Sequence, residues 1–172
     1  MGVEIERKFL LAGDGWRALV ERSEPIAQGY LVGMGAIEGG HARSSVRVRI
    51  SGEKAWLNIK SATLGIERQE YEYLVPLADA RHMLDTLADG VVEKVRHHVM
   101  LEGAHFEIDE FTGANAGLVV AEIELDAVDA SYPRPAWLGR EVSDCVRYYN
   151  VNLIDRPYRD WTPAERDGEE NA

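Results

Sequence analysis

Most of the chain alternates between apolar and polar residues with a period of two, which is the pattern of a β-strand whose two faces differ. Turn-forming segments separate eight such stretches. The predicted strands are Val3–Leu10, Ala27–Val32, Ser45–Ser51, Lys54–Ser61, Glu67–Val75, Glu93–Leu101, His105–Phe111 and Val119–Leu125. Eight strands are enough for an antiparallel sheet that closes into a barrel.

Helical periodicity is restricted to short segments. We predict helices that begin at Asp14, at Asp79 and at Ser143 or Asp144, because at each place a capping side chain precedes apolar residues spaced three or four apart. The segment Tyr132–Leu138 contains two prolines and predicts a turn or a short helix. The expected fold class is therefore mainly β with covering helices (α+β).

Two clusters of glycine, at Gly33–Gly40 and Gly113–Gly117, predict loops. Strand-like segments flank the first cluster, so we expect a mobile lid or rim segment there. No repeat or low-complexity linker divides the chain, and we expect one domain over residues 1–161. The polar tail over residues 162–172 is expected to be disordered.

The polar members of the alternation are mostly charged, and like charges recur two residues apart. Such pairs include Glu4 and Glu6, Arg47 and Arg49, Glu70 and Glu72, Lys94 and Arg96, and Glu122 and Glu124. One apolar and one solvated face is the common interpretation of alternation, but like charges side by side on one face are unfavourable. Their repetition favours a barrel with the charged face inward. A polyphosphate chelated by divalent cations would neutralise both signs of charge.

Composition sets further bounds on function. The chain has 30 Asp and Glu against 19 Lys and Arg, for a net charge of −11. This acidity argues against nucleic-acid and membrane partners, and no apolar segment is long enough to span a bilayer. We expect a cytoplasmic protein. Because acids and bases nearly balance on the presumed inner face, the negative charge belongs mainly to the outer surface and does not exclude a polyanionic ligand.

The segment Glu4–Lys8 resembles the ExExK signature of the CYTH superfamily, the triphosphate tunnel metalloenzymes. The resemblance extends over nearly the whole chain and is closest to the short bacterial branch, whose members include inorganic triphosphatases. Further matches, in chain order, are Gln28–Leu31, Val46–Arg49, Leu57–Lys60, Arg68–Glu72, Glu93–Arg96, Phe106–Phe111, Ala121–Glu124, Leu138–Val142 and Arg147–Asn150. The resemblance implies an eight-stranded antiparallel tunnel with a charged lumen.

The same resemblance implies roles for individual residues. One or two Mg²⁺ or Mn²⁺ ions would be bound by Glu4, Glu6, Asp109, Glu122 and Glu124. The phosphate chain would be bound by Lys8, Arg47, Arg49, Lys60, Arg68 and Arg96. Lys94 matches a lysine implicated in catalysis, and either contacts phosphate, positions water or protonates the leaving group. Glu70 and Glu72 either order the attacking water or pair with the arginines of the third predicted strand.

Two features stand apart from the family pattern. Many relatives have a lysine where this chain has Val146, so either Arg147 reaches inward or a basic contact is absent. Of the 5 histidines, His98 shares a face with Lys94 and Arg96 and is a functional candidate. The others lack metal-ligand spacing and are expected at the surface: His41, His82, His97 and His105.

Phosphoryl transfer depends on charge neutralisation and in-line positioning. We therefore expect metal-dependent hydrolysis of triphosphates, with inorganic tripolyphosphate converted to pyrophosphate and orthophosphate by water attack. The alternatives are a class IV-type adenylate cyclase, a thiamine triphosphatase, and a non-catalytic polyphosphate-binding module. Exposed aromatic strands and the predicted helix with Tyr148 and Tyr149 are compatible with a homodimer.

Overall fold

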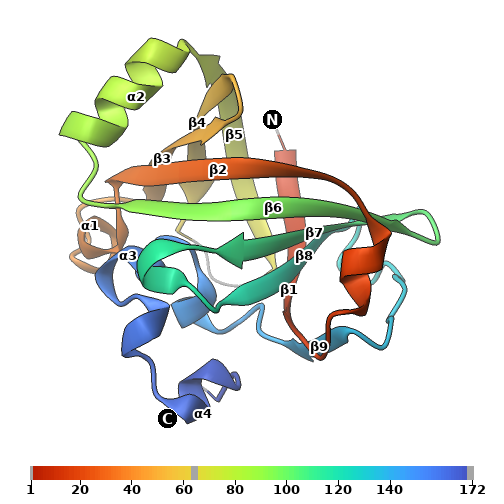
Figure 1. Cartoon of the computed structure of the whole chain (residues 1–172). Coiled ribbons are helices and arrows are strands. Elements are labelled where there is room, and N and C mark those ends of the chain that lie inside the picture. The colour runs from red at the N-terminus through yellow and green to blue at the C-terminus, as the bar shows by residue number, and fades with distance from the viewer. Residues whose placement is uncertain (1, 63–65, 170–172) are drawn as a thin grey trace.

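The computed structural model describes residues 2–62 and 66–169, which form one nine-stranded antiparallel sheet (Figure 1). The strands are β1 (Gly2–Leu11), β2 (Val20–Val32), β3 (Ser44–Ser51), β4 (Lys54–Ser61), β5 (Glu67–Val75), β6 (Val91–Leu101), β7 (Ala104–Phe111), β8 (Val119–Glu124) and β9 (Leu138–Glu141). The helical segments are η1 (Gly15–Leu19), α1 (Met34–Glu38), α2 (Leu77–Thr86), η2 (Gly113–Asn115), η3 (Val146–Tyr148), α3 (Asn152–Asp155), η4 (Tyr158–Asp160) and α4 (Pro163–Arg166).

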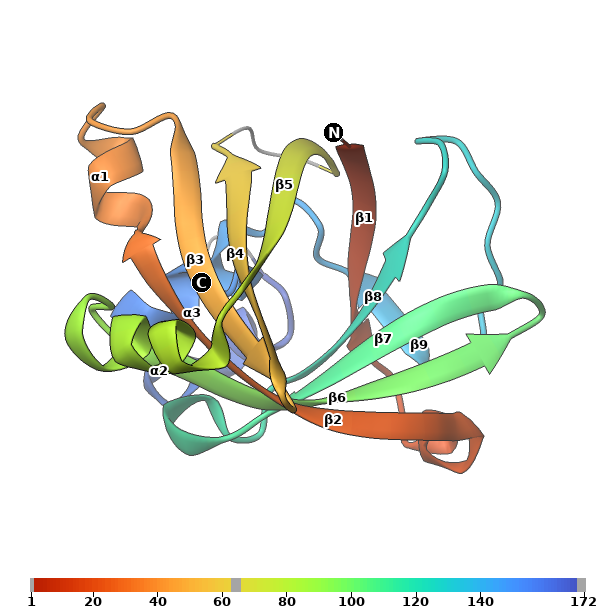
Figure 2. The same cartoon turned by 90° about the horizontal axis from the view of Figure 1, so that it is seen from above.

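Eight of the strands close into a barrel because β1 has two partners along its length. Residues 2–5 of β1 pair with β5, and residues 6–10 pair with β8. From β1 the order runs β5, β4, β3, β2, β6, β7, β8 and back to β1, as the view in Figure 2 shows. β9 is the additional strand and pairs with the end of β1. The predicted closed barrel is confirmed.

The hydrophobic core lies outside the barrel rather than within it. Phe9, Phe106 and Ile108 point away from the lumen and are fully buried beneath Trp16 and Trp137, which cover them from η1 and from the segment before β9. This inversion follows from closure, because alternate residues of a barrel strand face the inside and the outside. The charged residues of the same strands must then face one another across the lumen.

Two further coverings complete the outer layer. The carboxyl-terminal segment places Tyr148 and Trp161 against Val120 of β8, and α2 places Ala80 against Val48 of β3. Tyr148 is 1% exposed. It is therefore committed to the fold of one chain, and the expected contribution of Tyr148 to a dimer surface is wrong.

Strand β2 begins well before the predicted Ala27. Its first half, from Val20, pairs with β6, whereas β3 joins only from Ile26. At Pro25 the strand therefore pairs only with β6 in the described part of the chain. A sheet tolerates proline, which lacks an N–H group, at such an edge. Proline and a run of charged residues concealed this half of the strand from the hydrophobic pattern.

The predicted third helix is broken into η3 and α3. Tyr149, between them, has extended backbone (φ −72°, ψ 132°). The carbonyl oxygen of Tyr148, which would accept from residue 152 in a continuous helix, accepts instead from Lys8 Nζ at 3.3 Å. A buried ammonium thus replaces a helical hydrogen bond and turns the chain toward the lumen.

Two other segments differ from expectation. The glycine cluster at 33–40 contains helix α1 rather than only a loop. The predicted second helix begins at Leu77, after Pro76, with Asp79 in its first turn. In the segment Tyr132–Leu138 the predicted turn is present, since Leu138 N donates to the carbonyl oxygen of Pro135 at 2.9 Å, and Leu138 then begins β9.

The described part of the segment after Trp161, residues 162–169, contains helix α4. Thr162 and Glu165 form a reciprocal capping box. Glu165 is 2% exposed, and its carboxylate pairs with Arg156 at 2.9 Å and with Arg147 at 3.4 Å. A buried acid with two arginine partners is a contact that polar composition alone does not reveal.

No helix in the described ranges is long and apolar enough to cross a membrane.

Glu165→Gln tests the anchoring of the tail. The hydrogen bond from Arg156 is the main cause that lowers the pKa of Glu165 to about 2, against about 4.5 in the unfolded chain. The stabilisation is therefore complete above about pH 4.5 and is lost as the pH falls toward about 2. We expect Glu165→Gln to unfold at lower urea concentration at pH 7, and to lose less stability than the wild type between pH 5 and pH 3. The exposed Glu169→Gln is the matched control, and equal pH dependence of Glu165→Gln and wild type would contradict the assignment.

Candidate active site

The barrel holds a cavity of about 710 Å³, which lies within the range typical of ligand sites. Its walls carry the inward side chains of β1–β8 together with parts of α1 and the segment after η3. All predicted site residues line it except Asp109: Glu4, Glu6, Lys8, Arg47, Arg49, Lys60, Arg68, Glu70, Glu72, Lys94, Arg96, Glu122 and Glu124.

An acidic cluster lies where β1 and β8 meet. Glu6 and Glu124 are opposite one another in the strand register. Lys60 Nζ lies 2.7 Å from Glu4, and Arg68 Nη2 lies 3.7 Å from Glu6, whereas Glu124 has no ion pair among the described residues. Burial, and then the carboxylates of Glu4 and Glu6, raise the pKa of Glu124. Negative charge is therefore in excess here, and the cluster favours a cation.

Glu122, next on β8, is in the opposite situation. Its two oxygens lie 2.9 Å from Lys8 Nζ and 2.9 Å from Arg96 Nη2. Burial would raise the pKa of Glu122, but Lys8, Lys94 and Arg96 hold that pKa well below its ordinary value. Glu122 is thus an ionised carboxylate that bridges two cationic side chains.

The basic side of the cavity is built on β3. Arg49 pairs with Glu72 at 2.8 Å, and Arg47 lies 3.8 Å from Glu70. Burial, and then the charge of Arg47, lower the pKa of Arg49, as expected where positive charges crowd together. The Nε atoms of both arginines are buried and have no hydrogen-bond partner in the described part of the chain. This wall therefore offers donors to an anion.

Glu70 and Glu72 are held by β4 as well as by the arginines. Asn58 donates to Glu70 at 3.3 Å and to Glu72 at 2.5 Å, and Lys60 lies 3.5 Å from Glu70. Burial opposes ionisation of Glu70, but Lys60 and Arg47 lower its pKa below the ordinary value. These contacts correspond to the alternative in which the two acids pair with the arginines.

Lys94 and Asp109 are almost fully buried, at 3% and 0% exposure. Asp109 accepts from Lys94 Nζ and from Arg96, whose Nε lies at 2.7 Å. Both carboxylate oxygens are thereby engaged, and Asp109 lies behind the lining residues rather than among them. Burial lowers the pKa of Lys94 to about 8, with Asp109 opposing this and Arg96 adding to it.

The cavity also has uncharged lining residues that the charge pattern did not single out. Gln28 and Tyr30 lie on β2, and Gln28 Nε2 is buried without a hydrogen-bond partner in the described part of the chain. Tyr149 and Asn150 follow η3, and Asn150 Oδ1 lies 3.5 Å from Lys94 Nζ. Gln28 and Tyr30 occupy the inward positions of the alternation, so the periodicity contained this signal, but their lack of charge hid it.

Neither Val146, which stands where many relatives have a lysine, nor the neighbouring Arg147 places a positive charge in the cavity. Val146 is 42% exposed, and Arg147 pairs with Glu165 of the tail. Neither residue lines the cavity.

Two of the histidines expected at the surface make contacts that the sequence did not predict. His97 is half-buried against Trp16, with ring centroids 5.1 Å apart. His105 is exposed, as predicted, but it also lines the cavity and lies 2.9 Å from His98. The β6–β7 hairpin brings the latter two together although seven residues separate them.

The fold and the charged lumen define a recognisable class of protein. A family model of the CYTH domain matches residues 2–158. The chain belongs to the CYTH domain family.

Individual relatives agree with this assignment. The chain is 42% identical over 162 residues to an inorganic triphosphatase of Acetivibrio thermocellus, covering 94% of this chain and 99% of the relative. It is 36% identical over 157 residues to an inorganic triphosphatase of Nitrosomonas europaea, covering 87% and 95%. A crystal structure of an inorganic triphosphatase matches with a TM-score of 0.60 and 33% identity, covering 90% of this chain and 95% of that one.

Neutralising Glu122 and Glu124 one at a time should change the stability of the protein differently, because their environments differ. Glu122→Gln leaves the buried Lys8 ammonium without its carboxylate partner and removes one of three carboxylates from Arg96. It should lower the free energy of unfolding by about 3–5 kcal/mol. Glu124→Gln removes repulsion in the acidic cluster and should leave the metal-free protein equally stable or more stable. Urea unfolding in EDTA at pH 7 measures both, and equal destabilisation by the two variants would contradict the assigned environments.

Proposed function

We propose that this protein is a divalent-metal-dependent inorganic triphosphatase that hydrolyses tripolyphosphate to pyrophosphate and orthophosphate within the barrel. The observation that carries the proposal is a single cavity with an excess of carboxylate on β1 and β8 and unpartnered guanidinium donors on β3. The inorganic triphosphatases that are similar over nearly the whole chain support the same substrate class.

The acidic cluster fits a hard divalent cation. Glu4, Glu6 and Glu124 offer carboxylate oxygens alone, which is the donor set that Mg²⁺ and Mn²⁺ prefer. The raised pKa of Glu124 supports a missing positive charge at this place. Such a cation, when bound, would neutralise phosphate charge and acidify a bound water. Glu122, expected as a metal ligand, already forms ion pairs with Lys8 and Arg96, and its main role in this proposal is to position those two cations.

The basic wall would bind and orient the phosphate chain. Arg47 and Arg49 present forked donors that match phosphate oxygens. Lys60 contacts Glu4 and Arg68 contacts Glu6, so these two cations lie beside the acidic cluster. Lys8 and Arg96 approach from the β8 side, as their contacts with Glu122 place them. In this proposal Glu70 and Glu72 hold the arginines in position, in preference to ordering the attacking water.

Lys94 would act on the transferring phosphoryl group, by contacting its oxygens or protonating the leaving group. Asp109, expected as a metal ligand, is better suited to positioning, because both its oxygens are already bonded to Lys94 and Arg96. Burial of this pair gives a fixed arrangement of charge, which stabilises a transition state without reorganisation.

The lining favours an inorganic chain over a nucleotide. Its aromatic residues in the described ranges are Tyr30 and Tyr149. Tyr149 already faces Lys8 and Arg68, at 5.8 and 5.0 Å from its ring centroid, and Tyr30 is 7% exposed and bonded to Arg47. Neither ring is placed to stack on a base.

Phosphorus NMR of tripolyphosphate incubated with the protein and Mg²⁺ or Mn²⁺ tests the proposal. We expect equimolar pyrophosphate and orthophosphate. Glu4→Gln/Glu6→Gln should lower the turnover at least about 100-fold, because the acidic cluster loses two of its charges. Glu53→Gln, in the exposed β3–β4 turn, is the control and should behave as wild type.

The same experiment with ATP and thiamine triphosphate separates the alternatives. Cyclic AMP would indicate a cyclase, and preference for the thiamine ester a thiamine triphosphatase. Tight binding of tripolyphosphate without any product would indicate a binding module and would overturn the proposal.

The pH dependence tests the role of Lys94. Since burial lowers its pKa to about 8, the ammonium is charged below that pH and loses its proton above it. We expect kcat/KM to fall above about pH 8, and the fall to move to higher pH in Lys94→Arg, whose guanidinium stays charged. The exposed Lys54→Arg is the control. If Lys94→Arg is too slow to assay, tripolyphosphate affinity by calorimetry over the same pH range replaces it. An unchanged alkaline limb in Lys94→Arg would contradict the assignment.

A cytoplasmic location and a homodimer stay predictions. Light scattering coupled to size exclusion measures the oligomeric state.

A further inference from the structure

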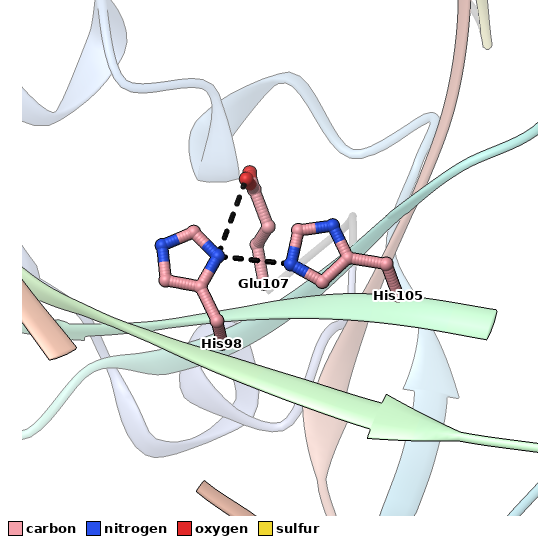
Figure 3. A group of neighbouring side chains, drawn as sticks. All are labelled: His98, His105 and Glu107. Carbon is pink, nitrogen blue, oxygen red and sulfur yellow. Dashed lines mark hydrogen bonds and ion pairs between the residues drawn. The ribbon is translucent and has the colours of Figure 1, made fainter. Parts of the chain in front are cut away.

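A second cluster of metal-ligating side chains lies on the β6–β7 hairpin, whereas the acidic cluster lies on β1 and β8. His98 Nδ1 lies 2.9 Å from His105 Nε2 and 3.9 Å from a carboxylate oxygen of Glu107 (Figure 3). Potential ligand atoms of the three residues all lie within 4.8 Å of one another. The two imidazole rings are nearly parallel, at 8°. Two imidazoles and one carboxylate thus converge on one point.

The orientation of His98 is set from behind by β2. His98 Nε2 lies 2.7 Å from Glu24 Oε1, and the other oxygen of Glu24 accepts from Ser51 at 2.5 Å. Burial opposes ionisation of Glu24, but the hydrogen bonds from Ser51 and His98 lower its pKa, so Glu24 is an anion that holds the proton on His98 Nε2. The lone pair of His98 Nδ1 then faces His105 and Glu107. A carboxylate that fixes the tautomer of a histidine in this way is typical of metal-ligating histidines.

We propose that His98 Nδ1, His105 Nε2 and Glu107 form a binding site for a transition-metal cation of the Zn²⁺ type, separate from the carboxylate cluster of Glu4, Glu6 and Glu124. Two imidazole nitrogens with one carboxylate are a donor set for zinc and its neighbours in the first row, whereas Mg²⁺ prefers oxygen ligands. The cation takes the place of the proton between the two rings. Water or a phosphate oxygen in the cavity completes its coordination, because His105 and Glu107 line the cavity.

The charged groups around the site are compatible with a cation. Arg22 Nη2 lies 3.4 Å from His98 Nδ1, but its side chain is 61% exposed and can turn into solvent. Arg96 pairs with the other oxygen of Glu107 and so orients the carboxylate. Burial, opposed by Glu107, lowers the pKa of His105, which keeps its ring neutral and available as a ligand. Arg96 also links this site to Glu122 and Asp109.

Cobalt titration tests the site in the whole protein. Co²⁺ is added to metal-stripped protein in excess Mg²⁺, with Glu4→Gln/Glu6→Gln as background so that the acidic cluster contributes least. We expect one Co²⁺ per chain, with the strong visible absorption of a tetrahedral centre with nitrogen ligands. Zn²⁺ should displace it with loss of that absorption.

Single substitutions in this background locate the bound ion. His105→Gln removes an exposed ligand and should weaken Co²⁺ binding by on the order of tenfold or more, and Glu24→Gln should weaken it by on the order of 10–100-fold through His98. His82→Gln, on the exposed face of α2, is the matched control. Circular dichroism verifies folding, and Glu24→Gln carries the test if His105→Gln does not fold. Weak absorption typical of six oxygen ligands, complete displacement by Mg²⁺, or equal affinity in the folded variants and the control would overturn the proposal.

Discussion

The protein depends on burying a set of opposite charges inside a closed sheet. Ion pairs join Lys94, Asp109, Arg96 and Glu122 in a continuous series across β6, β7 and β8, and these side chains are at most 11% exposed. Burying an ion without its partner costs several kcal/mol. Each charge can therefore face inward only because the neighbouring strand supplies its partner, so the register of the barrel and the composition of its lumen require one another.

That balance is incomplete in two places, and these are the places where we propose that the metal and the phosphate chain bind. Acids exceed bases around Glu124, and guanidinium groups crowd at Arg47 and Arg49. The apolar core outside the barrel stabilises the fold and so offsets the electrostatic repulsion within the lumen. A rigid field of this kind suits phosphoryl transfer, in which fixed charges rather than covalent chemistry lower the barrier.

Contacts between distant segments changed several expected roles. Asp109 shares the inward parity of Glu107, yet its oxygens are taken by Lys94 and Arg96. Helix α4 is joined to the rest of the chain by the contacts of Glu165 with Arg156 and Arg147. Neither contact has a sequence signature, since ion pairs across a barrel or between loops depend on distances in space and not on spacing along the chain.

The sequence by itself determined which residues face inward, because a strand places alternate side chains on opposite faces whatever its neighbours are. It also predicted closure, because like charges repeated on one face, such as Arg47 with Arg49 and Glu122 with Glu124, favour a charged lumen over a one-sided sheet. Only the tertiary structure decided which charges are neutralised, which remain in excess, and that His98 and His105 meet. Those outcomes follow from the strand register and the path of the carboxyl-terminal segment, because electrostatic energy depends on distance and burial, and both are properties of the folded chain.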